Sequence, residues 1–385
     1  MIVYRFIEPL DVLFLRGNHL FGDAGQHGQA LVPPWPSVVA GALRSRMLAD
    51  ATSVDFEAFK TGSKPAGALG EALGTPADPG TFELAGLWLA RSTEGQVQRY
   101  YPVPSDVLKL AGKLHRLRPR ELPLVSSANL PQVPVLQSEK ITKAEGGWLL
   151  NELGWQAWLH DQPLDAEQHA QPTSTLYALD ERLGIALDSN SRTAADGALY
   201  TAAAVAMHSD SGFVCAVRGV DDALVPASGL VRLGGDGRAA AISKVPSPGP
   251  TFANHSGEPT NLAVRRDRFK LVLTTPGVFE HGWKLPGLQP DNEWHGPDGC
   301  TARLVCAAVS RAETISGWDL AQWAPKPAQR VAPTGSVYWF ENFQGDPAAL
   351  GMLVESGLWG LPGQNSDALR RAEGFNNVAV AAWTA

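Results

Sequence analysis

Only two segments of this chain have the pattern of a helix, residues 37–48 and 346–359, and most of the remaining apolar residues fall in short runs typical of strands. A strand–helix–strand–strand order opens the chain, and no regular alternation of strand and helix follows, as parallel β-α-β units would require. The predicted strands cover residues 1–7, 82–90, 97–103, 199–207, 213–217, 230–245, 269–274, 303–309, 336–340 and 375–383. This order predicts an α+β protein built from two ferredoxin-like (RRM-like) domains with long insertions and Gly-rich loops.

The length of 385 residues is enough for two domains with separate cores, and the 44% of hydrophobic residues predicts globular folding. We place the N-terminal domain at 1–221, with an irregular insertion at about 104–180, and the C-terminal domain at 222–385. Residues 199–207 and 213–217 are predicted to form a hairpin that closes the first domain. Inside the insertion, Trp148, Trp155 and Trp158 either form a partner surface or pack against their own domain.

The chain shows no sign of membrane insertion, secretion or resident cofactors. No apolar run approaches the roughly 20 residues that span a bilayer, and the first residues have a strand pattern in place of a signal peptide, so we expect a cytoplasmic protein with no membrane association. The three cysteines include no CxxC pair, which argues against a disulfide framework. His281, His295, Cys300 and Cys306 match no spacing of a zinc module, and we predict neither a metal nor another cofactor.

The net charge of −7 argues against a protein that coats nucleic acid indiscriminately, but a local basic surface is sufficient for RNA contact. Two clusters offer such a surface or, alternatively, an ordinary solvated face: Lys109, Lys113, Arg116, Arg118 and Arg120, and Arg265, Arg266, Arg268 and Lys270. No P-loop, HExxH motif or nucleophile elbow is present, and no catalytic constellation is visible.

Five sets of segments, in order along nearly the whole chain, resemble the third subunit of the type III-B CRISPR (Cmr) effector complex, a member of the RAMP superfamily. They are residues 11–17, 21–22, 26–27 and 31–45 (LVPPWPSVVAGALRS); 182–185, 192–194 and 197–201; 231–238 (VRLGGDGR); 325–327, 330 and 333–340 (PTGSVYWF); and 371–376 (RAEGFN). The resemblance implies two ferredoxin-like domains in a non-catalytic scaffold that binds the 5′ tag of the guide RNA (crRNA). It also implies contact with the large cyclase-bearing subunit and a backbone subunit, and indirectly with target RNA.

Residues of these segments that could contact RNA are basic, aromatic, amide-bearing or glycine. Glycines allow close backbone approach to phosphate, and Arg offers a planar fork. The predicted RNA-binding residues are Arg16, His19, Gln26, His27, Arg44, Arg46, Arg192, Tyr200, Arg232, Gly234, Gly235, Arg238, Lys326, Arg330, Gly374, Phe375 and Asn376. Gly234 and Gly235 equally suit an ordinary hairpin turn.

We expect one groove in which Arg44 and Arg46 face Arg232 and Arg238, although these arginines could instead form internal ion pairs with carboxylates such as Asp236. Two other functions remain open. One is a metal-independent endoribonuclease that processes CRISPR repeat RNA with His19 or His27 as general base. The other is a subunit that contacts only proteins.

Overall fold

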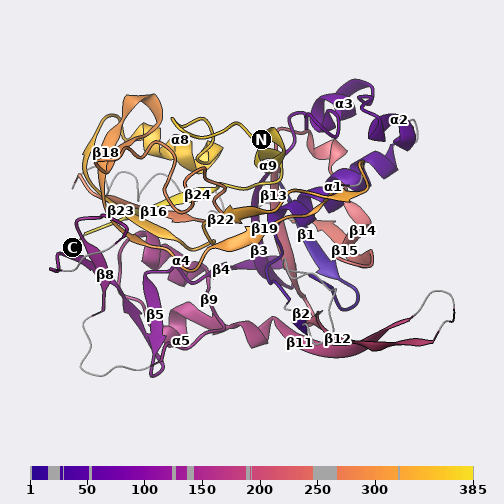
Figure 1. Ribbon diagram of the computed structural model, residues 1–385, viewed down its shortest axis with the longest axis horizontal. Coiled ribbons are helices and arrows are strands. Elements are labelled where there is room, and N and C mark those ends of the chain that lie inside the picture. The colour runs from indigo at the N-terminus through magenta and orange to yellow at the C-terminus, as the bar shows by residue number, and fades with distance from the viewer. Residues whose placement is uncertain are drawn as a thin grey trace. The chain divides into compact units, whose positions relative to one another are not determined.

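The computed structural model describes residues 2–15, 27–28, 30–51, 54–123, 127–136, 143–187, 191, 193–245, 267–319 and 321–384. The chain is a mixed α/β protein that divides into two compact units (Figure 1). Unit 1 consists of Met1–Val97, Ser174–Pro246 and Thr314–Ala328, and unit 2 of Gln98–Thr173, Ser247–Glu313 and Gln329–Ala385. The predicted domains, by contrast, were continuous in sequence and met at residue 221.

The main sheet of unit 1 is antiparallel and is centred on β1 (Ile2–Pro9). β13 (Ser211–Arg218) and β15 (Arg238–Lys244) pair with its two sides, β3 (Glu83–Thr93) lies beyond β13, and β14 (Ser228–Leu233) lies beyond β15. The strand predicted at 230–245 is therefore two strands joined by a turn, and it joins the sheet of the first strand of the chain.

The helix predicted at 37–48 is α1 (Pro36–Asp50), which begins with Pro at the first helical position. Val39, Leu43 and Met47 recur every four residues along the helix and are buried. This apolar stripe explains why α1 packs against β3 and β14.

A long two-stranded ribbon, β11 (Tyr177–Leu187) with β12 (Ala194–Met207), forms a second sheet of unit 1, and β2 (His27–Gly28) pairs parallel with β12 (Figure 1). The predicted hairpin of residues 199–207 with 213–217 is therefore wrong. A turn does connect β12 to β13, but β12 pairs with β11 and β2, whereas β13 pairs with β1 and β3 in the main sheet.

The main sheet of unit 2 is also antiparallel, and β16 (Phe269–Leu273) is one of its interior strands. β23 (Val337–Gln344) and β24 (Val378–Ala382) flank it, and β18 (Thr301–Ala308) follows beyond β23, with β17 (Glu293–His295) at the edge. The predicted helix at 346–359 is the shorter α8 (Ala348–Ser356), which packs against β24.

Residues 104–180, predicted to be irregular, contain regular structure. The segment from residue 96 onward holds β4 (Gln96–Pro102), β5 (Val107–Leu110), β6 (Lys113–Arg116), β7 (Arg118–Arg120), β8 (Val133–Val135), β9 (Trp148–Leu150), α4 (Glu152–Leu159), α5 (Ala166–His169) and β10 (Ala170–Pro172). The remaining elements are α2 (Phe56–Lys60), α3 (Gly67–Leu73), β19 (Glu313–Ile315), β20 (Trp318–Asp319), β21 (Ala324–Pro325), β22 (Gln329–Val331), α9 (Ala368–Ala372) and the short 3-10 helices Thr173–Thr175, Asp222–Leu224 and Pro297–Gly299. No helix in the described part of the chain is long and apolar enough to cross a bilayer.

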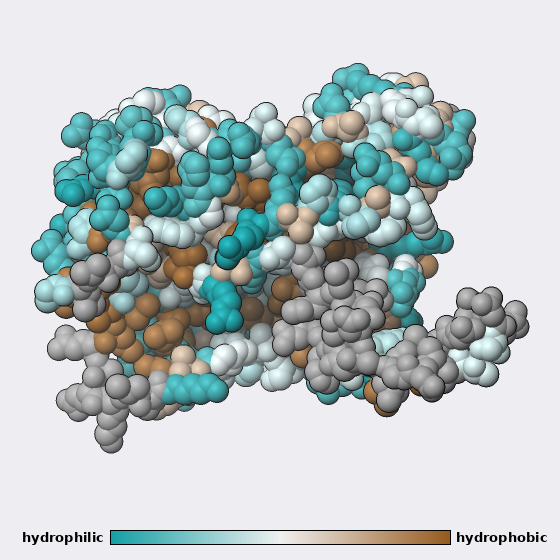
Figure 2. Space-filling model, viewed as in Figure 1, coloured by the Kyte–Doolittle hydropathy of each residue, from teal (hydrophilic) through white to brown (hydrophobic). Residues whose placement is uncertain are grey.

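Two of the three tryptophans of this segment pack inside unit 2. The ring of Trp155 stacks on Tyr101 at 4.7 Å and on Trp158 at 5.5 Å, and both tryptophans are buried. A partner surface formed by these two side chains is thus excluded in this structure. Hydrophobic residues do gather around α4 and β5 on the face shown in Figure 2. Leu153 of α4 is 68% exposed.

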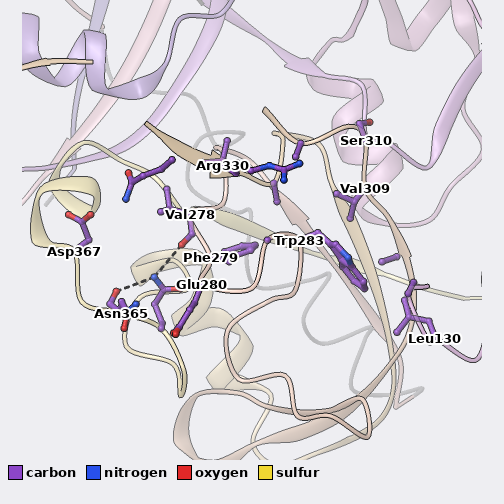
Figure 3. A pocket seen from close by; sticks show the side chains of 18 residues that line it. Leu130, Val278, Phe279, Glu280, Trp283, Val309, Ser310, Arg330, Asn365 and Asp367 are labelled. Carbon is purple, nitrogen blue, oxygen red and sulfur yellow. Dashed lines mark hydrogen bonds between the residues drawn. The ribbon is translucent and has the colours of Figure 1, made fainter. Parts of the chain in front are cut away.

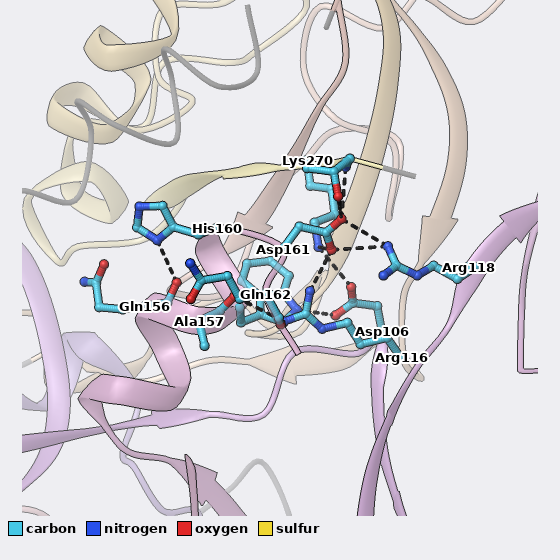
Figure 4. Close-up of polar contacts among 11 residues, drawn as sticks. Asp106, Arg116, Arg118, Gln156, Ala157, His160, Asp161, Gln162 and Lys270 are labelled. Atoms are coloured by element: carbon cyan, nitrogen blue, oxygen red, sulfur yellow. Dashed lines mark hydrogen bonds and ion pairs between the residues drawn. The ribbon is translucent and has the colours of Figure 1, made fainter. Parts of the chain in front are cut away.

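A network of buried charges joins α4 to β16 (Figure 4). The Lys270 ammonium is fully buried and lies 3.4 Å from Asp106 Oδ2, 3.9 Å from Asp161 Oδ1 and 4.2 Å from the centre of the Trp158 ring. Arg116 donates to Asp161 Oδ1 at 2.6 Å, and the backbone and hydroxyl of Thr384 both donate to Asp161 Oδ2. Burial alone would raise the pKa of Asp161, but Lys270, Thr384 and Arg118 together lower it from 3.8 to about 2.

We predict that Asp161→Asn destabilises unit 2 by about 3–5 kcal/mol at neutral pH, because it leaves Lys270 and Arg116 short of a buried counter-charge. The exposed pair of Glu57 with Lys60 provides the control, since Glu57→Gln should cost less than about 0.5 kcal/mol. Chemical denaturation of both variants and the parent protein measures the difference.

The same variant has an expected pH signature. Because the pKa of Asp161 is lowered on folding, its stabilising contribution is complete above about pH 4 and disappears as the pH falls towards about 2. Asp161→Asn should therefore lose this part of the acid sensitivity. A variant with full stability at neutral pH and an unchanged acid-unfolding curve would show that the network does not hold unit 2 together.

Candidate nucleic-acid interface

Gly234 and Gly235, which were predicted to bind RNA, lie in the turn between β14 and β15, and this turn contacts the segment after β1. Gly234, Asp236 and Gly237 have φ of +74°, +60° and +59°, the left-handed region that favours glycine. The backbone N–H of Gly235 donates to Phe14 O at 2.8 Å, which ties the turn to the segment after β1. The turn is thus a hairpin turn, as the simpler of the two interpretations held, and its contact with RNA remains a prediction.

Beside this turn lies a cavity of about 340 Å³, which we call the cradle. Its walls come from the segment after β1, the β11–β12 ribbon and the turn: Phe14, Arg182, Leu183, Gly184, Tyr200, Ala202 and Asp236. The cavity is at the small end of the range of ligand pockets.

Tyr200 supplies the aromatic wall of the cradle and is 38% exposed. Its ring lies directly over Gly184 on the paired strand. A Cβ on Gly184 would stand only 2.4 Å from the ring. The absent side chain of Gly184 therefore permits the position of Tyr200. The backbone of His27 pairs with Thr201, next to Tyr200, so the chain places two predicted RNA-binding residues on neighbouring strands.

Three arginines lie near the cradle: Arg182 and Arg238 each pair with a carboxylate, and Arg232 is exposed. Arg182, in the wall, pairs with Asp180 at 2.8 Å while both side chains stay nearly half exposed. Arg238 donates to Asp11 Oδ2 at 2.8 Å, and its guanidinium carbon lies 5.3 Å from the centre of the Phe14 ring. The expected internal ion pair exists, but its carboxylate is Asp11 and not Asp236. Arg232 is exposed on β14.

The arginines of α1 contribute to packing within unit 1. Arg44 donates to Leu73 O at 3.0 Å, and Arg46 pairs with Asp50 at 2.6 Å and donates to Leu230 O. Leu230 is four residues from Gly234 along β14, about 13 Å at the usual strand rise. Arg46 is thus held at the other end of this strand from the turn, and one groove that holds all four arginines remains a prediction.

The predicted RNA-binding residues near the C-terminus have side chains in the core of unit 2. Phe375 and Asn376 are fully buried, and Asn376 Oδ1 accepts the backbone N–H of Val278 at 2.6 Å. Burial contradicts direct RNA contact by these two side chains in this structure. Gly374 and Asn376 both have positive φ, +90° and +65°, so the loop has the backbone geometry of a glycine-rich loop with Asn in one position.

Arg330 is exposed and lines a larger cavity of about 810 Å³ within unit 2 (Figure 3). Phe279, Trp283, Glu280 and Asn365 are among the other residues of its walls. Our sequence reasoning missed this cavity because its walls come from five separate segments and no motif marks them. Lys326 belongs to unit 1, where its backbone N–H donates to Gly317 O at 2.9 Å.

The two basic clusters are not continuous surfaces. Lys109 is buried and pairs with Glu145, the side chain of Arg116 is 8% exposed and pairs with Asp161, and Lys270 is enclosed in the core. Burial therefore excludes both predicted roles of these three residues, an RNA-contacting surface and a solvated face. Arg16, His19, Gln26, Arg192, Arg265 and Arg266 lie outside the described residues, as does the side chain of His27.

The cysteines are free thiols inside the two units. Burial raises the pKa of Cys215 and of Cys306 to about 12, and the pKa of Cys300 to about 11. Thiols with raised pKa are poor nucleophiles and poor metal ligands at neutral pH. Within the described ranges, no group of three or more His, Cys, Asp or Glu side chains is placed to hold a metal ion.

Two glycines of the turn allow a matched test of its contact with Phe14. A Cβ on Gly234 would stand 2.9 Å from Phe14 O, whereas one on Gly237 would approach only Arg232 Cδ, at 3.6 Å. Both substitutions by Ala should cost roughly 1–2 kcal/mol for the left-handed backbone, and Gly234→Ala should cost a further 1–3 kcal/mol or so for the clash. Equal melting temperatures of the two variants would contradict a close contact between the turn and Phe14.

The chain matches a protein-family model and is similar to a number of solved structures. The family model of the CRISPR-associated protein Cas_Cmr3 matches residues 5–383. One similar structure is a chain of the type III-B Cmr-beta complex bound to cognate target RNA and AMPPnP, with 14% identity, a TM-score of 0.45, and coverage of 95% of this chain and 91% of that chain. Another is a chain of the same type of complex bound to cognate target RNA, with 14% identity, a TM-score of 0.48, and coverage of 97% and 96%. No curated protein sequence matches. The family model spans nearly the whole chain and confirms the resemblance of the five sets of segments: this protein belongs to the Cas_Cmr3 family of CRISPR-associated proteins.

Proposed function

We propose that this chain is a non-catalytic, RNA-binding subunit of a type III-B Cmr effector complex in the cytoplasm. In this role it holds the 5′ tag of the guide RNA and bridges the large cyclase-bearing subunit to a backbone subunit. Membership of the Cas_Cmr3 family over residues 5–383 is the observation that carries the proposal.

The strand order supports the two ferredoxin-like domains that the proposal includes. Numbered along the chain, β1, β3, β13 and β15 form strands 1 to 4 of unit 1, and their order in the sheet is 2-3-1-4. β16, β18, β23 and β24 have the same order in unit 2, and all pairings in both sets are antiparallel. α1 connects strands 1 and 2 of the first set, and α8 connects strands 3 and 4 of the second. Each set therefore has one of the two helices of a β-α-β-β-α-β unit in the expected place.

The cradle supplies the chemistry that a single-stranded RNA tag requires. Tyr200 offers an aromatic face to a base, and Arg182 offers a planar fork to a phosphate. The β14–β15 turn contributes Asp236, an acceptor for the amino groups of a base, to the third wall. Stacking and hydrogen bonding of unpaired bases are the usual means by which proteins read single-stranded RNA.

Retention of guide RNA in the assembled complex tests the proposal. Arg182→Ala should reduce retention and lower the slope of log affinity against log salt by about 0.7, the value for one phosphate contact to a single strand. Tyr200→Ala should weaken binding at all salt concentrations without changing the slope, because stacking releases no counterions. Lys60→Ala removes a similarly exposed cation from α2 of the same unit and should change neither quantity. Normal guide occupancy in well-folded Arg182 and Tyr200 variants would argue against the cradle.

A second expectation concerns catalysis. No catalytic motif is visible in the sequence, and the described residues that line the cradle include no histidine, the general base of the competing endoribonuclease hypothesis. We therefore expect the purified chain to leave repeat RNA uncut with or without divalent metal ions. Steady cleavage that disappears in His27→Ala would favour the endoribonuclease function instead.

A further inference from the structure

A short hairpin of unit 1 presents two tryptophans to solvent. β20 and β21 form this hairpin, which we call the indole hairpin, with Trp318 paired to Pro325. Trp318 is 51% exposed and Trp323 is 74% exposed, the highest value for any large hydrophobic side chain in the described part of the chain. The two rings meet edge to face, with centroids 5.8 Å apart. Neither ring belongs to the core, so the packing of unit 1 does not explain them.

The hairpin is fixed by hydrogen bonds within its own loop. Asp319 Oδ1 accepts the backbone N–H groups of Ala321 and Gln322 at 2.9 and 3.1 Å, and Ser316 Oγ donates to Lys326 O at 2.7 Å. Trp323 has a φ of +52°, a conformation that bulky residues rarely adopt. The strained backbone and the exposed indole both raise the free energy of the unbound protein. Together they indicate a binding role for the hairpin.

We propose that Trp318 and Trp323 form a stacking platform for an unpaired base of RNA, from either the guide or the target strand. Lys326 is the cation of this platform, since its Cδ lies 3.6 Å from the position that a Cβ on Gly317 would occupy, next to Trp318. Indole faces beside a lysine are the combination that binds bases and backbone of single-stranded nucleic acid. This inference rests on the proposed RNA-binding function and adds a second site, distinct from the cradle.

The area of the patch favours a base over a protein partner. Two indoles at these exposures offer roughly 300 Å², whereas a stable protein interface takes about 800 Å² from each side. Of the described hairpin residues, Gln322 and Lys326 are polar and Asp319 uses its carboxylate to fix the loop, while the apolar neighbours Ala321, Ala324 and Pro325 are small beside the two indoles. A purine or pyrimidine covers an area of the size that one indole provides.

Fluorescence anisotropy of the full chain with a labelled 12-nucleotide oligouridylate tests the platform. Trp318→Ala and Trp323→Ala should each weaken binding about 5- to 150-fold, which corresponds to one lost base stack, with an unchanged salt slope. Trp323→Phe should retain most of the affinity. Phe56→Ala removes an exposed aromatic ring from α2 of the same unit and should have no effect. Circular dichroism and melting temperature report whether each variant is folded.

The outcomes separate this inference from the proposed function. A parent chain that fails to bind the oligomer would overturn both, whereas equal binding by the parent and both folded Trp→Ala variants would overturn the platform alone. Loss of subunit association with unchanged RNA affinity would assign the hairpin to a protein partner and also overturn it. In the assembled complex, photo-crosslinking with 5-iodouridine placed in the guide in one sample and in the target in another should modify Trp318 or Trp323, and the sample that reacts identifies the strand. No crosslink to either residue in both samples would count against the platform.

Discussion

The fold of unit 2 depends on the neutralisation of one buried ammonium group. Burying an ion costs several kcal/mol unless partners replace its hydration, and Lys270 is enclosed on an interior strand of its sheet. Both of its carboxylate partners, Asp106 and Asp161, come from the segment between residues 98 and 173. The Tyr101, Trp155 and Trp158 stack comes from the same segment and covers the ammonium with an aromatic face. This segment is therefore part of the core and not an accessory that could be removed.

Unit 1 contains a similar arrangement on the equivalent strand. Arg5 of β1 is 2% exposed and donates to Pro226 O at 2.6 Å, Val225 O at 2.8 Å and Asp222 Oδ1 at 2.7 Å. Asp222 also pairs with Lys244 of β15. In both units, then, strand 1 of the four (β1 in unit 1 and β16 in unit 2) holds a buried cation whose partners lie outside the four strands. In unit 1 those partners fix the start of the β14–β15 hairpin, and hence the position of the turn beside the cradle.

Local patterns in the sequence were sufficient for most elements and insufficient for their partners. Alternation and turn residues located β1, β3, β16, β18, β23 and β24, because each such pattern depends on neighbours in the sequence. The partner of β12 is a strand that precedes it, and the units are assembled from three segments each, which no local pattern specifies. The same limit applies to the site. The family segments named Tyr200 and the Gly234–Gly235 turn as separate candidates without predicting their proximity, and the burial of Lys270, Phe375 and Asn376 depends on strands distant in the sequence.

The distribution of charge implies how this protein would hold RNA. Many of its cations are already paired within the chain, among them Arg5, Arg46, Arg99, Arg116, Arg218, Arg238 and Arg370. With these cations paired and a net charge of −7, we expect the non-specific electrostatic contribution to affinity to be small. Under the proposed function, stacking on Tyr200 and on the indole hairpin would then carry a larger share of the binding energy than phosphate contacts. Such binding discriminates unpaired RNA from duplex, since only unpaired bases can leave their own stack to meet an aromatic side chain.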